Sequence, residues 1–310
     1  MDRLWNEIIG IGAAVYDTLM VVDRFPAEDT KLEGRETRVQ GGGPCATALV
    51  AAQKLGCNTA YMGTMGDDLF GQFLRNDFLR WGVDTRFVTL VPGAISFHSV
   101  VLLNQRTSSR TCIWNRGTVP PPDAALLDAE ALAHAKVLHL DGHMLDAALC
   151  AARLCRQSGA KVSYDAGGTY PGVERLLPLV DWLIPSEEFA LKITGADSAQ
   201  SAAQRLYKTY RPELIAITQG ARGGLLLDEK GLRRYDSFPV EAKDTNGCGD
   251  TFHGAFIAGM LQGMDAGTAC EYASAAAAIK CTRLGAREGM PTDEECRAFL
   301  HSRGRRIFHG

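Results

Sequence analysis

Residues 136–168 read KVLHLDGHMLDAALCAARLCRQSGAKVSYDAGG, and this stretch decides the fold class. Its two ends, KVLHLDG and AKVSYDAGG, are short apolar runs that predict buried strands. The middle, LDAALCAARLCRQSG, has the apolar spacing of a helix. A strand, a helix and a second strand in this order predict two parallel strands joined by a crossover helix.

The same alternation runs along most of the chain, from EIIGIGAAV near the N-terminus to GGLLLDEKG. It predicts an α/β protein with a mostly parallel sheet covered by helices. CATALVAAQKLG predicts a helix followed by Gly56, and FGQFLRNDFLRWG predicts one closed by Gly82. TAYMGTMG between them predicts one strand. Because no linker or internal repeat divides the 310 residues, we expect a single domain over 1–310.

Two stretches interrupt the alternation, at about 21–40 and 96–116. The second, SFHSVVLLNQRTSSRTCIWNR, predicts antiparallel strands joined by a polar turn at 106–109. We expect the two stretches to form a small β sheet that projects from the main one as a lid.

The composition excludes several classes of partner. Lys and Arg number 33 and Asp and Glu number 36, so the net charge of −3 provides no positive field for nucleic acid or an acidic membrane. No run reaches the ~18 apolar residues of a membrane span, and the N-terminus lacks the long apolar core of a signal peptide. The nine cysteines show no Cys-x-x-Cys or zinc-finger spacing. We therefore expect a cytoplasmic protein with reduced thiols and a small-molecule partner.

The stretch DTNGCGDTFHGAF, residues 244–256, predicts a site for an anion. Gly247, Cys248 and Gly249 precede an apolar helix, where small residues leave the backbone N–H groups uncovered. Asp250 beside them would repel a bound phosphate, which argues against a purely structural role. Phosphoryl transfer accounts for it, because a carboxylate is then needed to take the proton of the attacking hydroxyl. That arrangement is typical of phosphoryl transfer. The spacing alone equally allows Asp250 to be an ordinary helix cap.

Other glycine-rich stretches are weaker signals. GIGAAVYD places Asp17 just after a strand, and QGGGPCATA places Gly41–Gly43 before a helix. ITQGARGG places Thr218, Gly220 and Gly223 between two strands, where a nucleotide could lie against bare backbone. A glycine run is more often a turn than a ligand loop. YASAAAAIKCTRLGA predicts a helix of small residues followed by a glycine loop, and close helix packing is the simpler explanation of those small residues.

Four segments together resemble the ribokinase or PfkB family of ATP-dependent sugar kinases. GGGPCATALVAAQKLG, GTMGDDLFGQFLRNDFLRWGVDT, TQGARGG and DTNGCGDTFHGAF occur in this order and span nearly the whole chain. The resemblance implies a three-layer α/β/α, doubly wound fold with a projecting β lid, and in many members the lids pair into a homodimer. It also implies transfer of the γ-phosphoryl group of Mg-ATP to a hydroxyl of a small sugar, such as a ketose, a pentose or an anionic sugar.

The resemblance further implies roles for individual residues. Asp250 matches the catalytic base, and the matching anion hole is Gly247, Cys248 and Gly249. The positions that hold the sugar are Asp17, Gly42, Gly43 and Thr47, the last standing where ribokinases have Asn. The nucleotide-binding turn is matched by Thr218, Gly220 and Gly223. The loops that enclose a monovalent cation such as K⁺ are matched by Asp244, Asn246, Arg283, Gly285 and Gly289.

The chain departs from the family pattern at the magnesium position. The family often has Asn-x-x-Glu there, but this chain reads PSEEF, with Ser186 and Phe189 at those two places. We expect Glu187 to substitute, contacting Mg²⁺ and the nucleotide through water.

GGGPCATA and IKCTRLGAREGMP resemble the sulfofructose-kinase branch of the family. That branch holds an anionic group with Lys, Asn and Arg, of which Lys31 and Asn115 match the first two. His143 stands in place of the Arg and is a poorer partner for a sulfonate. Arg116 either compensates for this or is a solvated charge of the lid.

Other functions are weighed against this one. GIGAAV lacks the full dinucleotide-binding spacing of an oxidoreductase, and no Walker sequence occurs. A nucleoside kinase on the same fold remains an alternative, since Phe97 and Trp114 of the lid could stack on a base. The other alternative is a non-catalytic sugar sensor, against which Asp250 argues.

Overall fold

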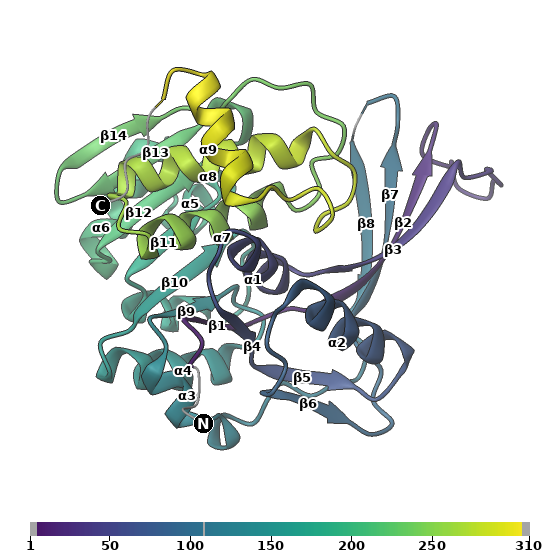
Figure 1. The fold of residues 1–310 in the computed structure, drawn as a ribbon, viewed down its shortest axis with the longest axis horizontal. Helices are drawn as coiled ribbons and strands as arrows, with labels where there is room; N and C mark the ends of the chain where they lie inside the picture. The colour runs from purple at the N-terminus through teal and green to yellow at the C-terminus, as the bar shows by residue number, and fades with distance from the viewer. Residues whose placement is uncertain (1–4, 108, 306–310) are drawn as a thin grey trace.

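The large sheet positions the rest of the molecule. The computed structural model describes residues 5–107 and 109–305, and in them a sheet of eight strands lies between two layers of helices (Figure 1). Its order is β14 (Gly231–Tyr235), β13 (Gly224–Asp228), β12 (Leu214–Thr218), β11 (Trp182–Pro185), β10 (Lys161–Ala166), β9 (Val137–Leu140), β1 (Ile8–Ile11) and β4 (Thr59–Tyr61). β12 to β4 pair in parallel, and β13 and β14 are antiparallel. The expected mostly parallel sheet is confirmed.

Helices cover both faces of this sheet. One core contains residues of α1 (Pro44–Lys54), α2 (Leu69–Trp81), α7 (Cys248–Leu261), α8 (Ala266–Cys281) and α9 (Asp293–Ser302). The other contains residues of α3 (Ala129–His134), α4 (Leu145–Gln157), α5 (Glu187–Thr194) and α6 (Ala199–Tyr210). Successive strand residues feed the two cores in turn, because their side chains alternate between faces: Ile8 packs in the first and Ile9 in the second.

Helix ends follow the local sequence signals. Gly56 and Gly82 have φ of 97° and 81°, and Gly82 is the C-cap of α2. Asp68 begins the same helix by accepting a hydrogen bond from the Gly71 amide at 2.8 Å. Both expected helices are therefore present with the expected ends.

A separate four-stranded sheet forms the lid, which stands apart from the body at the right of Figure 1. Its order is β3 (Glu36–Gly42), β2 (Val15–Val22), β7 (His98–Asn104) and β8 (Arg110–Asn115). β7 and β8 form the expected antiparallel pair. The first lid segment begins at Val15 rather than at 21, because Val15 already pairs with Gly42.

The stretch TAYMGTMG is two strands rather than one. β4 joins the large sheet beside β1, while β5 (Gly63–Gly66) pairs with β6 (Val88–Val91) in a two-stranded sheet. The apolar run is continuous, so it holds no signal that the chain changes its partner at Met62. Among the described helices, none combines the length and the apolar character needed to cross a bilayer.

Candidate active site

The three residues of the expected anion hole, Gly247, Cys248 and Gly249, lie together at the N-terminus of α7. Gly247 is the N-cap with φ of 76°, and no side chain caps the helix. The first amides of a helix lack partners within it and carry the positive end of its dipole. A Cβ on Gly254 would lie 2.3 Å from the Ala48 carbonyl, so only glycine lets α7 pack this closely on α1.

Asp250 lies in the first turn of α7 and is half-buried. Its carboxylate does not cap the helix, so the ordinary cap interpretation does not hold. Removal of water by burial raises the pKa of Asp250 to about 7, and the negative charge of Asp165 adds to the shift. A carboxylate with a pKa near 7 is suited to accept a proton at neutral pH.

A buried contact between His253 and Asp165, close to Asp250, was not found from the sequence. The His253 Nε2 lies 3.2 Å from an Asp165 oxygen, and both side chains are buried. Burial alone would raise the pKa of Asp165, but His253 outweighs it and holds this pKa below its usual value. Asp165 is the second-last residue of β10 and His253 lies in the second turn of α7, so their contact joins α7 to the carboxyl end of the sheet.

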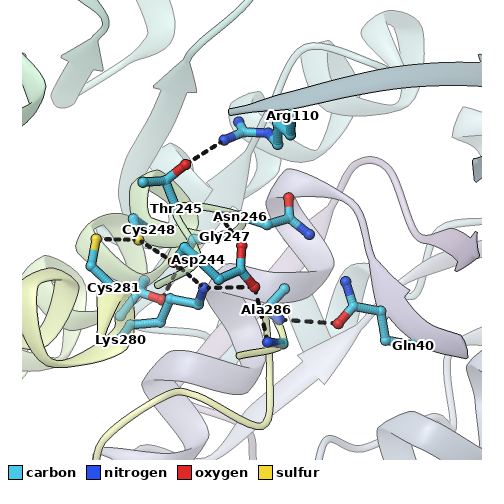
Figure 2. A network of polar contacts seen from close by, with 12 residues as sticks. Gln40, Arg110, Asp244, Thr245, Asn246, Gly247, Cys248, Lys280, Cys281 and Ala286 are labelled. Carbon is cyan, nitrogen blue, oxygen red and sulfur yellow. Dashed lines mark hydrogen bonds and ion pairs between the residues drawn. The ribbon is translucent and has the colours of Figure 1, made fainter. Parts of the chain in front are cut away.

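Asp244 organises the loop that leads into the anion hole (Figure 2). One of its carboxylate oxygens accepts the Asn246 amide at 2.8 Å, and the other accepts the Gly285 amide at 2.9 Å. The fully buried Lys280 donates to the Asp244 carbonyl at 2.9 Å, and its Nζ lies 3.5 Å from the carboxylate. The loop is thus tied to the end of α8 and to the segment that follows it.

The expected cation loops do meet, but they do not fit a monovalent cation at Asp244. The Lys280 ammonium already supplies the positive charge there, and both carboxylate oxygens accept amides. Of the residues expected, Asn246, Gly285 and Gly289 lie on this loop pair, since the Gly289 amide donates to the Gly285 carbonyl. The Arg283 side chain instead pairs with Glu295 of α9.

The expected sugar-binding residues meet where the lid joins the body. Asp17 of β2 is buried and accepts the Ser99 hydroxyl at 2.6 Å. A Cβ on Gly42 would lie 2.0 Å from an Asp17 oxygen, so glycine is needed for this close approach. Burial raises the pKa of Asp17 to about 6. Gly43 caps α1, and Thr47 is fully buried one turn later.

Arg287 holds the glycine loop from behind and was not expected from the sequence. It is fully buried, pairs with Asp77 of α2 at 2.5 Å, and donates to the Gly42 carbonyl at 3.0 Å. Gln40 is buried beside it and accepts the Ala286 amide at 3.1 Å. The segment 285–287, which follows α8, therefore contacts both the end of β3 and the loop that contains Asp244.

Of the residues expected to hold an anionic head group, Lys31 lies on a different segment from Asn115 and Arg116. Lys31 is exposed in the loop between β2 and β3, and Asn115 is exposed at the end of β8, where it accepts the Gly117 amide. His143 and Arg116 do approach each other, with 3.4 Å between Nδ1 and the guanidinium. These two line a mostly apolar cavity of about 140 Å³ that adjoins Ala13 and Ala14 at the start of the lid.

The expected nucleotide turn lies between β12 and β13. Thr218 ends β12, and Gly220 and Gly223 have φ of 59° and 77°. A Cβ on Gly223 would lie 2.2 Å from the Tyr235 carbonyl. The turn therefore presents bare backbone that only glycine can form.

Glu187, expected near the metal and nucleotide, binds the same turn. One carboxylate oxygen accepts Gln219 at 2.6 Å, and the other pairs with Arg222. In this conformation the carboxylate holds the turn in place. No cluster of three or more His, Cys, Asp or Glu at metal-binding spacing occurs within 5–107 and 109–305. Mg²⁺ in kinases is bound largely by substrate phosphates and water, with one or two carboxylates.

Arg110 of the lid contacts the loop that precedes α7. This β8 residue donates to the Thr245 hydroxyl at 3.1 Å, as Figure 2 shows. Its charge opposes the rise in the pKa of Asp250. Arg110 therefore places a positive group near the start of α7, where a phosphate is expected. The sequence alone does not distinguish this residue from any other charged residue of the lid.

Comparisons with known proteins agree with this geometry. Residues 6–293 match the model of the "pfkB family carbohydrate kinase". Ribokinase of Haemophilus influenzae is 29% identical, over 94% of this chain and 97% of that protein. A solved structure from Agrobacterium tumefaciens has a TM-score of 0.90 at 28% identity, covering 97% of this chain and 100% of the other. Arabidopsis thaliana ribokinase, solved with ribose and ATP, has a TM-score of 0.83 at 24% identity, over 96% and 99% of the two chains.

These comparisons correct one expectation. The relatives named above are ribokinases rather than sulfofructose kinases. The ribokinase-like fold with a large sheet and a separate lid sheet is confirmed. The chain belongs to the pfkB family of carbohydrate kinases and is an ATP-dependent phosphotransferase with an alcohol group as acceptor.

Proposed function

We propose that this kinase transfers the γ-phosphoryl group of Mg-ATP to a primary hydroxyl of a small neutral sugar, with ribose the first candidate. The observation that carries the proposal is the Asp250 carboxylate, which caps nothing and has a pKa of about 7 at the N-terminus of α7. Similarity to ribokinases supports a pentose.

Each group of residues has a task in this reaction. The acceptor hydroxyl lies between Asp250 and the γ-phosphate, and Asp250 takes its proton as the oxygen attacks. The amides of the anion hole stabilise charge on the transferred group. Asp17 and Gly42 orient the other sugar hydroxyls, and the turn from Thr218 to Gly223 holds the nucleotide. Glu187, which here contacts Gln219 and Arg222, is the carboxylate that would hold Mg²⁺ through water, and the ion would supply positive charge to the phosphates.

A panel of acceptors tests the substrate class. We expect ADP release, measured by a coupled assay, to be fastest with ribose among ribose, fructose, 2-keto-3-deoxygluconate, fructose phosphates, sulfofructose and nucleosides. A preference for nucleosides would favour the alternative in which Phe97 and Trp114 of the lid, 5.7 Å apart, stack on a base. Sugar binding without ADP release for any acceptor would instead support a non-catalytic sensor.

We also propose that the lid pairs with a second copy of the chain. Three apolar side chains, Val39, Val100 and Ile113, are exposed by 42%, 42% and 65%. The strand register places them in one row across the sheet, with Thr18 between Val39 and Val100. A row of this kind on the solvent face indicates an interface.

Light scattering tests this dimer. We expect twice the chain mass of 33.5 kDa for the parent, and the monomer mass for Ile113→Glu, because a charge buried against a partner at the most exposed member of the row disfavours pairing. Leu126→Glu is the control, since Leu126 is 82% exposed and lies outside the lid. A monomeric parent chain at all concentrations would contradict the proposal.

A further inference from the structure

Two thiols face each other at the entrance to the anion hole. Cys248 is the first residue of α7, Cys281 is the last residue of α8, and their sulfur atoms lie 2.7 Å apart (Figure 2). Both are half-buried and both are free thiols. The two positions are 33 residues apart in sequence, so the contact depends on how α7 packs against α8.

Backbone hydrogen bonds hold the two segments that carry the thiols together. The amides of Lys243 and Asp244 both donate to the Cys281 carbonyl, at 2.7 and 3.1 Å. This pairing holds the loop before α7 against the end of α8. A disulfide has an S–S distance of about 2.05 Å, so closure needs a sulfur movement of only about 0.6 Å.

We propose that Cys248 and Cys281 form a reversible disulfide when the protein meets hydrogen peroxide, and that this bond switches off phosphoryl transfer. In the first step the Cys281 sulfur attacks the peroxide, the O–O bond breaks, and a sulfenic acid and one water form. The Cys248 sulfur then attacks the sulfenic sulfur and displaces a second water. Two thiols are thereby oxidised and one peroxide is reduced to two waters. A dithiol reverses the reaction by exchange.

The loss of activity follows from the position of Cys248 in the anion hole. The bond would tie the Cys248 side chain to the end of α8 and hold the first turn of α7 in one position. The amides of Cys248 and Gly249 could then no longer adjust to the transferred group. Errors of ~1 Å in the alignment of reacting groups cost roughly 10²-fold in rate, and a misfit of a fraction of that size is expected to cost at least tenfold. The inhibition rests on the function proposed above, whereas formation of the disulfide does not.

The first measurement asks whether the bond forms in the full-length parent chain. After treatment with hydrogen peroxide and blocking of free thiols, digestion without reductant should yield a peptide pair joined through Cys248 and Cys281. The cross-link should disappear after treatment with dithiothreitol. Absence of this pair would overturn the proposal, whether or not the chain phosphorylates a sugar.

The second measurement asks whether the bond controls turnover. We expect peroxide to lower the parental ADP-release rate at least tenfold and dithiothreitol to restore it. Cys281→Ser and Cys281→Ala should keep the basal rate and lose the reversible inhibition. Cys112→Ser, which removes an exposed thiol elsewhere, should behave as the parent. Full activity of the cross-linked protein, or equal inhibition of both Cys281 variants, would overturn the switch.

Discussion

Replacing Asp250 by Asn is expected to lower turnover with ribose by about 10²- to 10⁴-fold, the usual contribution of a positioned base. Asn has nearly the same shape, so sugar and nucleotide binding should change little. Single-turnover phosphate transfer and equilibrium binding of each substrate separate the two effects. If Asp250 were only structural, Asp250→Asn would keep a rate near the parental value, and such a result would falsify the assignment.

The pH profile of the parent gives this prediction a second readout. Because the pKa of Asp250 is about 7 in the free protein, the carboxylate is ionised above that pH and protonated below it. Only the ionised form accepts a proton, so kcat/KM should fall as the pH drops through about 7. The residual activity of Asp250→Asn should lack this limb. An identical limb in both proteins would assign the titration to another group.

Lys280→Met is expected to lower the free energy of unfolding by about 3–5 kcal/mol, the cost of leaving a buried charge without its partner. Lys280 and Asp244 are both fully buried, so no solvent replaces the lost ammonium. Urea unfolding followed by circular dichroism measures the change. Lys161→Met is the matched control, because its pair with Glu213 is exposed and should contribute under about 1 kcal/mol. Equal stability of both variants would contradict the role of Lys280.

The same variant tests the monovalent cation. We expect the parental rate to be the same in potassium and tetramethylammonium chloride, because the Lys280 ammonium supplies the charge beside Asp244. In Lys280→Met that charge is missing, and KCl should raise the unfolding temperature more than tetramethylammonium chloride does. Strong potassium activation of the parent would show that a cation binds here despite the lysine.

Much of the fold and the outline of the site could be predicted from the sequence because the signals are local. Strand and helix alternation, the glycines after α1 and α2, and the apolar start of α7 depend on neighbours within one or two turns. Asp250 was found because it follows small residues at a helix start. Its cap alternative was removed only when the structure showed no such hydrogen bond.

The remaining features depend on contacts between distant parts of the chain. Arg287 lies 210 residues from Asp77 and 245 from Gly42, and Lys280 lies 36 from Asp244. No propensity or period reports such pairs, since a buried Arg or Lys reads in sequence like a solvated one. The division of TAYMGTMG into β4 and β5 was not predicted for the same reason. The two strands pair with β1 and β6, which lie elsewhere in the sequence.

The sequence by itself determined which segments become strands and helices and which carboxylate follows the amides, because backbone preference and side-chain periodicity act over a few residues. The tertiary structure alone decided the pKa of Asp250, the ammonium beside Asp244 and the meeting of Cys248 with Cys281. Burial and charge proximity depend on which helices pack together, and that choice is made by the whole core at once.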